Sequence, residues 1–126
     1  MTRSLRAIAL MLAVAAPALA HHSFDAEYDI KKVATLSGFV TQIDWQNPHA
    51  FVYLDVANDK GAVTSFRIEM GPPYALVRGG WKKDTLKIGD KVTVEGAALA
   101  KDGSHSAGSM PTTMMVLASG QKLVMR

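Results

Sequence analysis

The chain has 126 residues, no cysteine and a formal net charge of +3, with 14 Lys+Arg against 11 Asp+Glu. The absence of cysteine excludes both a disulfide framework and a thiolate metal site. The excess of basic residues is too small for the clustered basic face that nucleic-acid binding normally requires, so we expect no nucleic-acid partner.

Residues 1–20 have the three-part layout of a secretory signal peptide. Arg3 and Arg6 precede an apolar run that ends in Ala-Leu-Ala, the small-x-small pattern of a cleavage site after Ala20. The apolar run is short for a membrane span, and no second run of spanning length follows. We therefore expect a periplasmic protein that is soluble after signal cleavage, with residues 21–126 as one small domain.

Period-two alternation of apolar and polar residues predicts five β-strands in that domain. In the first, at 33–45, Leu36, Val40 and Gln42 share one face, and the mid-strand Gly38 indicates a bulge or a sharp bend. The remaining strands are expected at 50–56, 63–70 and 91–99 and within 112–120, and residues 121–125 are expected to continue the last strand or to pair with it. The glycine- and serine-rich stretch at 103–109 is expected to be a loop.

A short helix is predicted between the third and fourth strands. Pro72 and Pro73 suit a helix start, residues 74–78 form one or two turns, and Gly79-Gly80 ends them. Three strands, a helix and two strands is the element order of the OB-fold, a small five-stranded antiparallel Greek-key barrel. The sequence thus predicts an all-β, OB-like barrel; another small antiparallel barrel or sandwich is the alternative.

Three motifs resemble a known family. They are the paired histidines that open "HHSFDAEYD", the Trp-x-Asn-Pro-His stretch at 45–49, and the Gly-x-Pro…Gly-Trp segment at 71–81. Together they resemble a family of small exported bacterial proteins known as DUF6152. The resemblance implies an exported β domain and no established biochemical activity.

Two histidines follow the predicted cleavage site, and they suggest a metal site. Cleavage would give His21 a free α-amine, with a pKa of about 7.7 to 8.0, that a metal ion deprotonates readily. The amine and the imidazole of His21, with one imidazole nitrogen from His49, make a three-nitrogen set suited to tetragonal copper(II), known as a histidine brace. Pro48 stiffens the turn that carries His49, and a metal site needs such rigid support.

Other versions of this site are also open. His22 can bind copper(II) through the terminal amine, the ionised backbone nitrogen and its own imidazole, and zinc(II) is a less favoured metal for the same ligands. Asp25 or Glu27 is expected to orient an imidazole, because metal-bound histidines usually donate their second N–H to a carboxylate. The predicted metal ligands are therefore His21, His22 and His49, and copper is the predicted cofactor.

Methionine offers a competing metal site. Thioethers select copper(I), and five methionines follow the signal: Met70, Met110, Met114, Met115 and Met125. Core packing is the simpler role for them, because one member of the adjacent pair at 114–115 must point inward from a strand.

A metal-free binding or interaction module with an unknown periplasmic partner is the main alternative function. In that case His49 only closes a turn, His105 is a solvated loop residue, and Phe51, Tyr53 and Phe66 either fill the core or stack on a peptide or glycan. No nucleophile elbow, phosphate-binding loop or catalytic cysteine is present. We therefore expect no enzymatic activity and assign no catalytic residue.

Overall fold

The structure is a computed structural model that describes residues 23–126, and it is mostly β. A helical turn over 23–27 precedes the first strand. The elements that follow are β1 (Tyr28–Asp44), β2 (Phe51–Ala57), β3 (Val63–Glu69), α2 (Pro73–Arg78), β4 (Lys91–Ala100), β5 (Ser106–Gly108), β6 (Met114–Val116) and β7 (Lys122–Val124).

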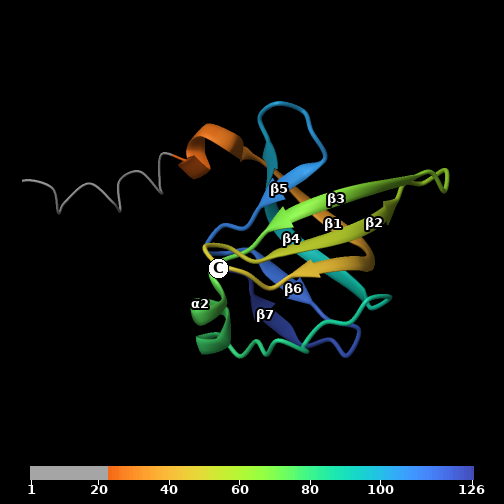
Figure 1. Ribbon diagram of the computed structural model, residues 1–126. Coiled ribbons are helices and arrows are strands. Elements are labelled where there is room, and N and C mark those ends of the chain that lie inside the picture. The colour runs from red at the N-terminus through yellow and green to blue at the C-terminus, as the bar shows by residue number, and fades with distance from the viewer. Residues whose placement is uncertain (1–22) are drawn as a thin grey trace, which may run out of the picture.

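Five of the strands close into a ring in the order β1-β2-β3-β5-β4, and β4 pairs again with β1. The long β1 serves both neighbours, because its first part pairs with β4 and its last part with β2. All pairs in the ring are antiparallel except β3 with β5, which is parallel. The ring curls around a single apolar core, and β6 and β7 extend the sheet from β4 (Figure 1).

The inner face of β2 and β3 follows the predicted alternation. Val52 and Leu54 are fully buried and lie opposite Ile68 and Phe66 of β3. Phe51 and Tyr53 alternate with them and are only partly buried, so they lie on the outer face of β2. Of the two roles left open for these aromatic residues, the core role applies to Phe66, which packs against the core, and not to Phe51 and Tyr53.

The expected helix is present as α2 between β3 and β4. Proline stands at its first turn and Gly79 caps its end, as the sequence predicts. Leu76 points into the core, and the nearby Trp81 is 2% exposed and donates its indole N–H to the carbonyl of Val124 at 2.7 Å. Trp81 therefore closes one end of the barrel.

The C-terminal part of the chain differs from the prediction. Seven strands are present instead of five. The strand within 112–120 is β6, which lies outside the ring, and β7 pairs with it, one of the two arrangements expected for 121–125. The ring is closed instead by β5, inside the stretch predicted to be a loop. Small residues over three positions carry no period-two signal, because their side chains are too small to mark an inner face.

The residues of β1 do not all alternate as predicted. Leu36 and Val40 are buried as predicted, but Gln42 is exposed because the register shifts between Val40 and Gln42. Gly38 lies between two register shifts and not at one. A Cβ there would lie 2.1 Å from the carbonyl oxygen of Asp55, so glycine permits close approach of β2.

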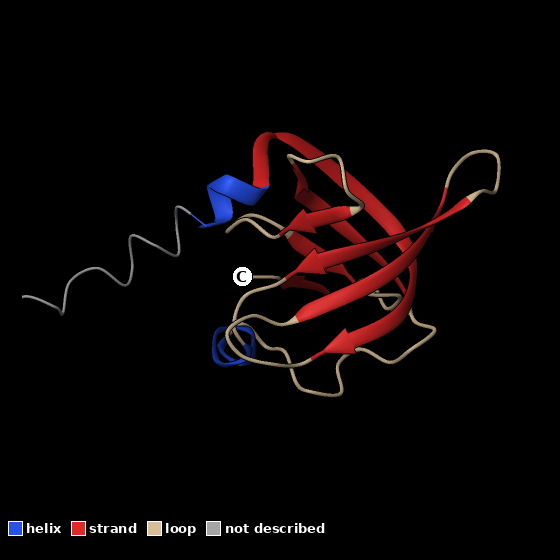
Figure 2. Ribbon diagram, turned by 45° about the horizontal axis from the view of Figure 1, so that its top comes forward, coloured by secondary structure: helices blue, strands red, loops and turns tan. Residues whose placement is uncertain are grey.

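The predicted signal peptide at 1–20 lies outside the described residues. Among residues 23–126, no helix is long and apolar enough to cross a membrane. The helical turn at 23–27, α2 and the C-terminus lie on the same side of the barrel (Figure 2).

Candidate functional site

A single carboxylate, that of Glu69, joins two distant parts of the sequence. The hydroxyl of Tyr28 donates to Oε2 of Glu69 at 2.7 Å, and Nδ1 of His49 lies 2.8 Å from Oε1. The Glu69 side chain is 16% exposed. Both oxygens of this carboxylate thus have a protein partner.

The fold brings these groups together at the end of β3. Glu69 is the last residue of β3 and pairs with Phe51, the first residue of β2. The backbone N–H of Ala50 donates to Gly71 at 3.2 Å, and that of Met70 donates to Ala50 at 2.8 Å. These bonds fix the β1–β2 loop against the end of β3, so the neighbouring His49 reaches Glu69.

The contact with Glu69 determines which nitrogen of His49 is available. A carboxylate accepts hydrogen bonds and does not donate them, so Nδ1 of His49 carries the proton. In the neutral imidazole, Nε2 then keeps its lone pair. The His49 side chain is 38% exposed, so solvent or a metal ion can reach its imidazole ring.

Tyr28 is a neutral donor in this arrangement. The residue is 3% exposed. Burial is the main cause that raises the pKa of its hydroxyl above the ordinary value, and the hydrogen bond to Glu69 raises it further. The hydroxyl therefore keeps its proton at pH values above the ordinary tyrosine pKa of about 10.

Of the three predicted metal ligands, the structure describes His49. His21 and His22 lie outside the described residues, while His49 lies in the β1–β2 loop with its ring held by Glu69. Within residues 23–126, no group of three or more His, Cys, Asp or Glu side chains is arranged to hold a metal ion. The fourth histidine, His105, is exposed and its ring lies 5.4 Å from that of Phe66.

The carboxylate that orients His49 is Glu69. The expected role of Asp25 or Glu27 can still apply to the imidazole of His21 or His22, and these histidines lie outside the described residues. Sequence alternation identifies Glu69 only as an outer-face residue of a strand. Its importance follows from the pairing with Phe51, which places it beside the β1–β2 loop. Nothing in the local sequence distinguishes Glu69 from Asp55, another outer-face carboxylate.

Three of the methionines are buried, unlike His49. Met70, Met115 and Met125 belong to the apolar core and are 3%, 0% and 0% exposed. Met115 is thus the inward member of its pair, and Met114 is only partly buried. The three buried thioethers are packed among apolar side chains, as the core-packing role predicts.

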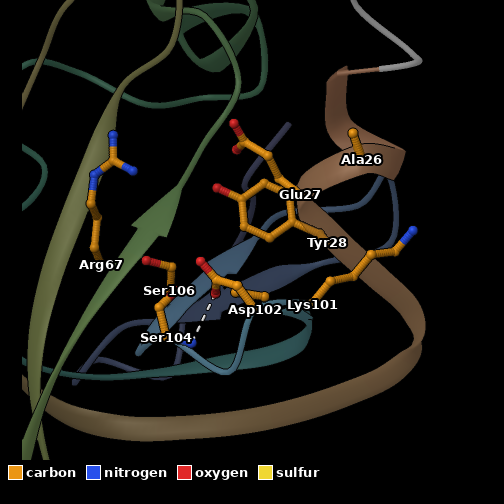
Figure 3. A pocket seen from close by; sticks show the side chains of 9 residues that line it. Ala26, Glu27, Tyr28, Arg67, Lys101, Asp102, Ser104 and Ser106 are labelled. Carbon is orange, nitrogen blue, oxygen red and sulfur yellow. Dashed lines mark hydrogen bonds between the residues drawn. The ribbon is translucent and has the colours of Figure 1, made fainter.

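A polar pocket of about 510 Å³ lies beside Tyr28, between the helical turn, β3 and the β4–β5 loop (Figure 3). Arg67 borders it, and its guanidinium carbon lies 3.7 Å from the centroid of the Phe51 ring. Hydrogen bonds from Ser104 lower the pKa of Asp102 at the opposite rim. The pocket joins groups of both charge signs, and it is open to solvent.

Comparison with known proteins gives one family match. No curated protein and no solved structure matches the chain. The model of one family, described as a family of unknown function (DUF6152), matches residues 9–109. This range contains the ring of strands, Glu69 and all four histidines, and excludes β6 and β7. The chain therefore belongs to the DUF6152 family.

Proposed function

We propose that the protein is exported to the periplasm and binds copper(II) through its processed N-terminus and His49, as a carrier or a sequestering protein. The ligands are the α-amine of His21, the imidazole of His21 or His22, and Nε2 of His49. This set is rich in nitrogen, which suits copper(II).

One observation carries the proposal: the Tyr28–Glu69–His49 chain of hydrogen bonds. Metal-binding histidines commonly donate their second ring N–H to a carboxylate, which fixes the tautomer and the ring orientation. His49 has this partner, and its Nε2 is left for a metal ion. Tyr28 immediately follows the helical turn that begins after His22, so the same carboxylate ties the N-terminal part of the domain to His49.

The family match supports the inclusion of the N-terminal histidines. It begins at residue 9, so part of the predicted signal peptide and both histidines after it lie inside the matched region. A metal site built there would belong to the family's common part of the chain.

The proposal also includes the fold: we take the ring to be an OB-like barrel. The strand order β1-β2-β3-β5-β4, the parallel pairing of β3 with β5 and the position of α2 support this assignment. In such a barrel the β1–β2 loop carries His49 at the rim, where a ligand approaches from solvent.

Titration with copper(II), followed by electron paramagnetic resonance, tests the proposal. The protein starting at His21 is compared with a version that carries one extra N-terminal alanine, which moves the α-amine away from His21. We expect tight one-to-one binding with a nitrogen-rich signal in the first, and weaker binding with a different signal in the second. Equal, weak binding in both would refute the copper site and favour the metal-free binding module.

A further inference from the structure

The polar pocket beside Tyr28 has charged groups of both signs on opposite walls. Arg67 of β3 lies on one wall, and Glu27 at the end of the helical turn lies on the other (Figure 3). Most of the lining residues are charged or carry a hydroxyl group. Pockets for drug-like molecules are predominantly apolar, so this lining suits a small hydrophilic ligand instead.

Arg67 is held in place by an aromatic ring. Its guanidinium carbon lies 3.7 Å from the centroid of the Phe51 ring, so one face of the planar group is covered. Arg67 forms no ion pair with any carboxylate among residues 23–126. A guanidinium fits a carboxylate with two parallel hydrogen bonds, so Arg67 can bind a carboxylate that a ligand brings.

The opposite side of the pocket carries two carboxylates. Glu27 is exposed, and Asp102 is kept ionised because hydrogen bonds from Ser104 lower its pKa. Lys101 also borders the pocket, but its ammonium group points away from the other labelled side chains (Figure 3). A purely anionic ligand would be repelled by the two carboxylates, and a purely cationic ligand would be repelled by the guanidinium.

The helical turn that carries Glu27 is packed against the barrel. A Cβ added to Gly108 of β5 would lie 2.6 Å from the ring of Phe24, so this ring rests directly on the backbone of β5. The backbone N–H of Lys101 donates to the carbonyl of Glu27 at 2.8 Å. Because protein contacts fix both walls before a ligand arrives, less conformational freedom is lost on binding.

We propose that this pocket binds a small zwitterion, a free amino acid or a short peptide, with its carboxylate at Arg67 and its ammonium group at Glu27 and Asp102. These ligands share an anionic and a cationic group on one hydrophilic molecule, which matches the charges of the two walls. The volume of about 510 Å³ lies within the range of small-molecule sites. The site uses none of the proposed copper ligands, so it goes beyond the copper proposal and is independent of it.

Nuclear magnetic resonance titration of the metal-free protein with glycine, diglycine and triglycine tests the proposal. Metal is left out because amino acids and peptides bind copper(II) themselves. We expect binding to shift the backbone N–H signals of Arg67, Ser104 and Ser106. Tightest binding of glycine would assign the site to free amino acids, and tightest binding of diglycine or triglycine would assign it to short peptides.

Derivatives of the tightest-binding probe test each charge separately. The N-acetyl derivative lacks the ammonium group and the amide lacks the carboxylate, so each should bind about tenfold more weakly than the probe itself. Absence of shifts at the three signals would overturn the proposed site. Equal binding of the probe and its two derivatives would overturn it as well.

Variants of the two walls complete the test. Arg67→Gln should weaken binding of the probe by about tenfold and abolish the difference between the probe and its amide. Arg78→Gln is the matched control, because Arg78 also lies over an aromatic ring, 5.6 Å from the centroid of Tyr74, but on α2. Glu27→Gln should weaken binding too, whereas Asp59→Asn, at an exposed carboxylate between β2 and β3, should not. Equal affinities in Arg67→Gln and Arg78→Gln would overturn the assignment of the carboxylate to Arg67.

Discussion

The barrel interior and the outer surface around Glu69 both contain residues that bind metals in other settings. The interior holds Met70, Met115 and Met125, each surrounded by apolar side chains. The outer surface holds His49, whose ring is oriented by a carboxylate and is 38% exposed. A metal ion cannot reach the buried thioethers, whereas it can reach an oriented imidazole at the surface, and for this reason the proposed site uses His49 and not the methionines.

The largest expected effect concerns the interior. Met115→Ala removes a fully buried side chain from the core, and we expect a loss of about 2–5 kcal/mol in the free energy of unfolding. Met114→Ala, a neighbouring but only partly buried position, should cost about 1 kcal/mol or less. Urea unfolding measures both changes. Copper(II) affinity should stay the same in both variants. A loss of copper affinity in correctly folded Met115→Ala would support a methionine metal site.

The second prediction concerns the outer surface. We expect His49→Ala to weaken copper(II) binding by about 100-fold, which is about 2.7 kcal/mol, because a ligand is lost. The free energy of unfolding should change by less than about 1 kcal/mol, since the imidazole is 38% exposed. Isothermal titration calorimetry measures the affinity, and His105→Ala is the matched control with no expected effect. Equal affinities in the two variants would exclude His49 as a ligand.

The third prediction separates the carboxylate from the ligand. Glu69→Gln keeps the size of the side chain and removes the charge that orients His49, so we expect copper(II) binding to weaken by about tenfold. The hydrogen bond from Tyr28 loses its charged acceptor, so we also expect a loss of roughly 1 kcal/mol in stability. Asp55→Asn, on the same outer face, should change neither quantity. An affinity unaffected by Glu69→Gln would mean that the negative charge of Glu69 does not contribute to copper binding.

The last prediction is a pH dependence of stability that is confined to alkaline pH. The pKa of Tyr28 is raised in the folded state, so its stabilising contribution is complete below the ordinary tyrosine pKa of about 10 and declines as the pH rises above it. There the unfolded chain releases a proton that the folded protein retains, at up to about 1.4 kcal/mol per pH unit. Tyr28→Phe should make the fall in stability above pH ~10 shallower in urea unfolding.

Tyr74→Phe is the control for that measurement, because Tyr74 is 65% exposed on α2. It should leave the alkaline fall in stability unchanged. Identical slopes in the two variants would show that Tyr28 is not the group responsible.

Local sequence patterns predicted most of the regular elements. Alternation across Val52 and Leu54 located β2 and its inner face, and the prolines before α2 with Gly79 after it located the helix. These features are local, because side-chain period and turn chemistry act within a few residues. The metal ligands His21, His22 and His49 were also named from local context, and they stay a proposal.

Local patterns did not predict the features that depend on pairing between distant segments. β5 has no alternation of its own and exists because β3 and β4 supply its hydrogen-bonding partners. The outward position of Phe51 likewise depends on which face of β2 the closed ring turns inward. Such features depend on pairing between segments far apart in the chain, which a local pattern does not encode.

By itself, the sequence determined the predicted export signal, the all-β class, the order of strands and helix up to β4, and the presence of His49 in a stiff turn. Only the tertiary structure decided that Glu69 faces His49 and Tyr28, and that Gly108 receives the ring of Phe24. The physical reason is that composition and period describe one segment at a time, whereas these contacts arise when ring closure brings β1, β3 and β5 together.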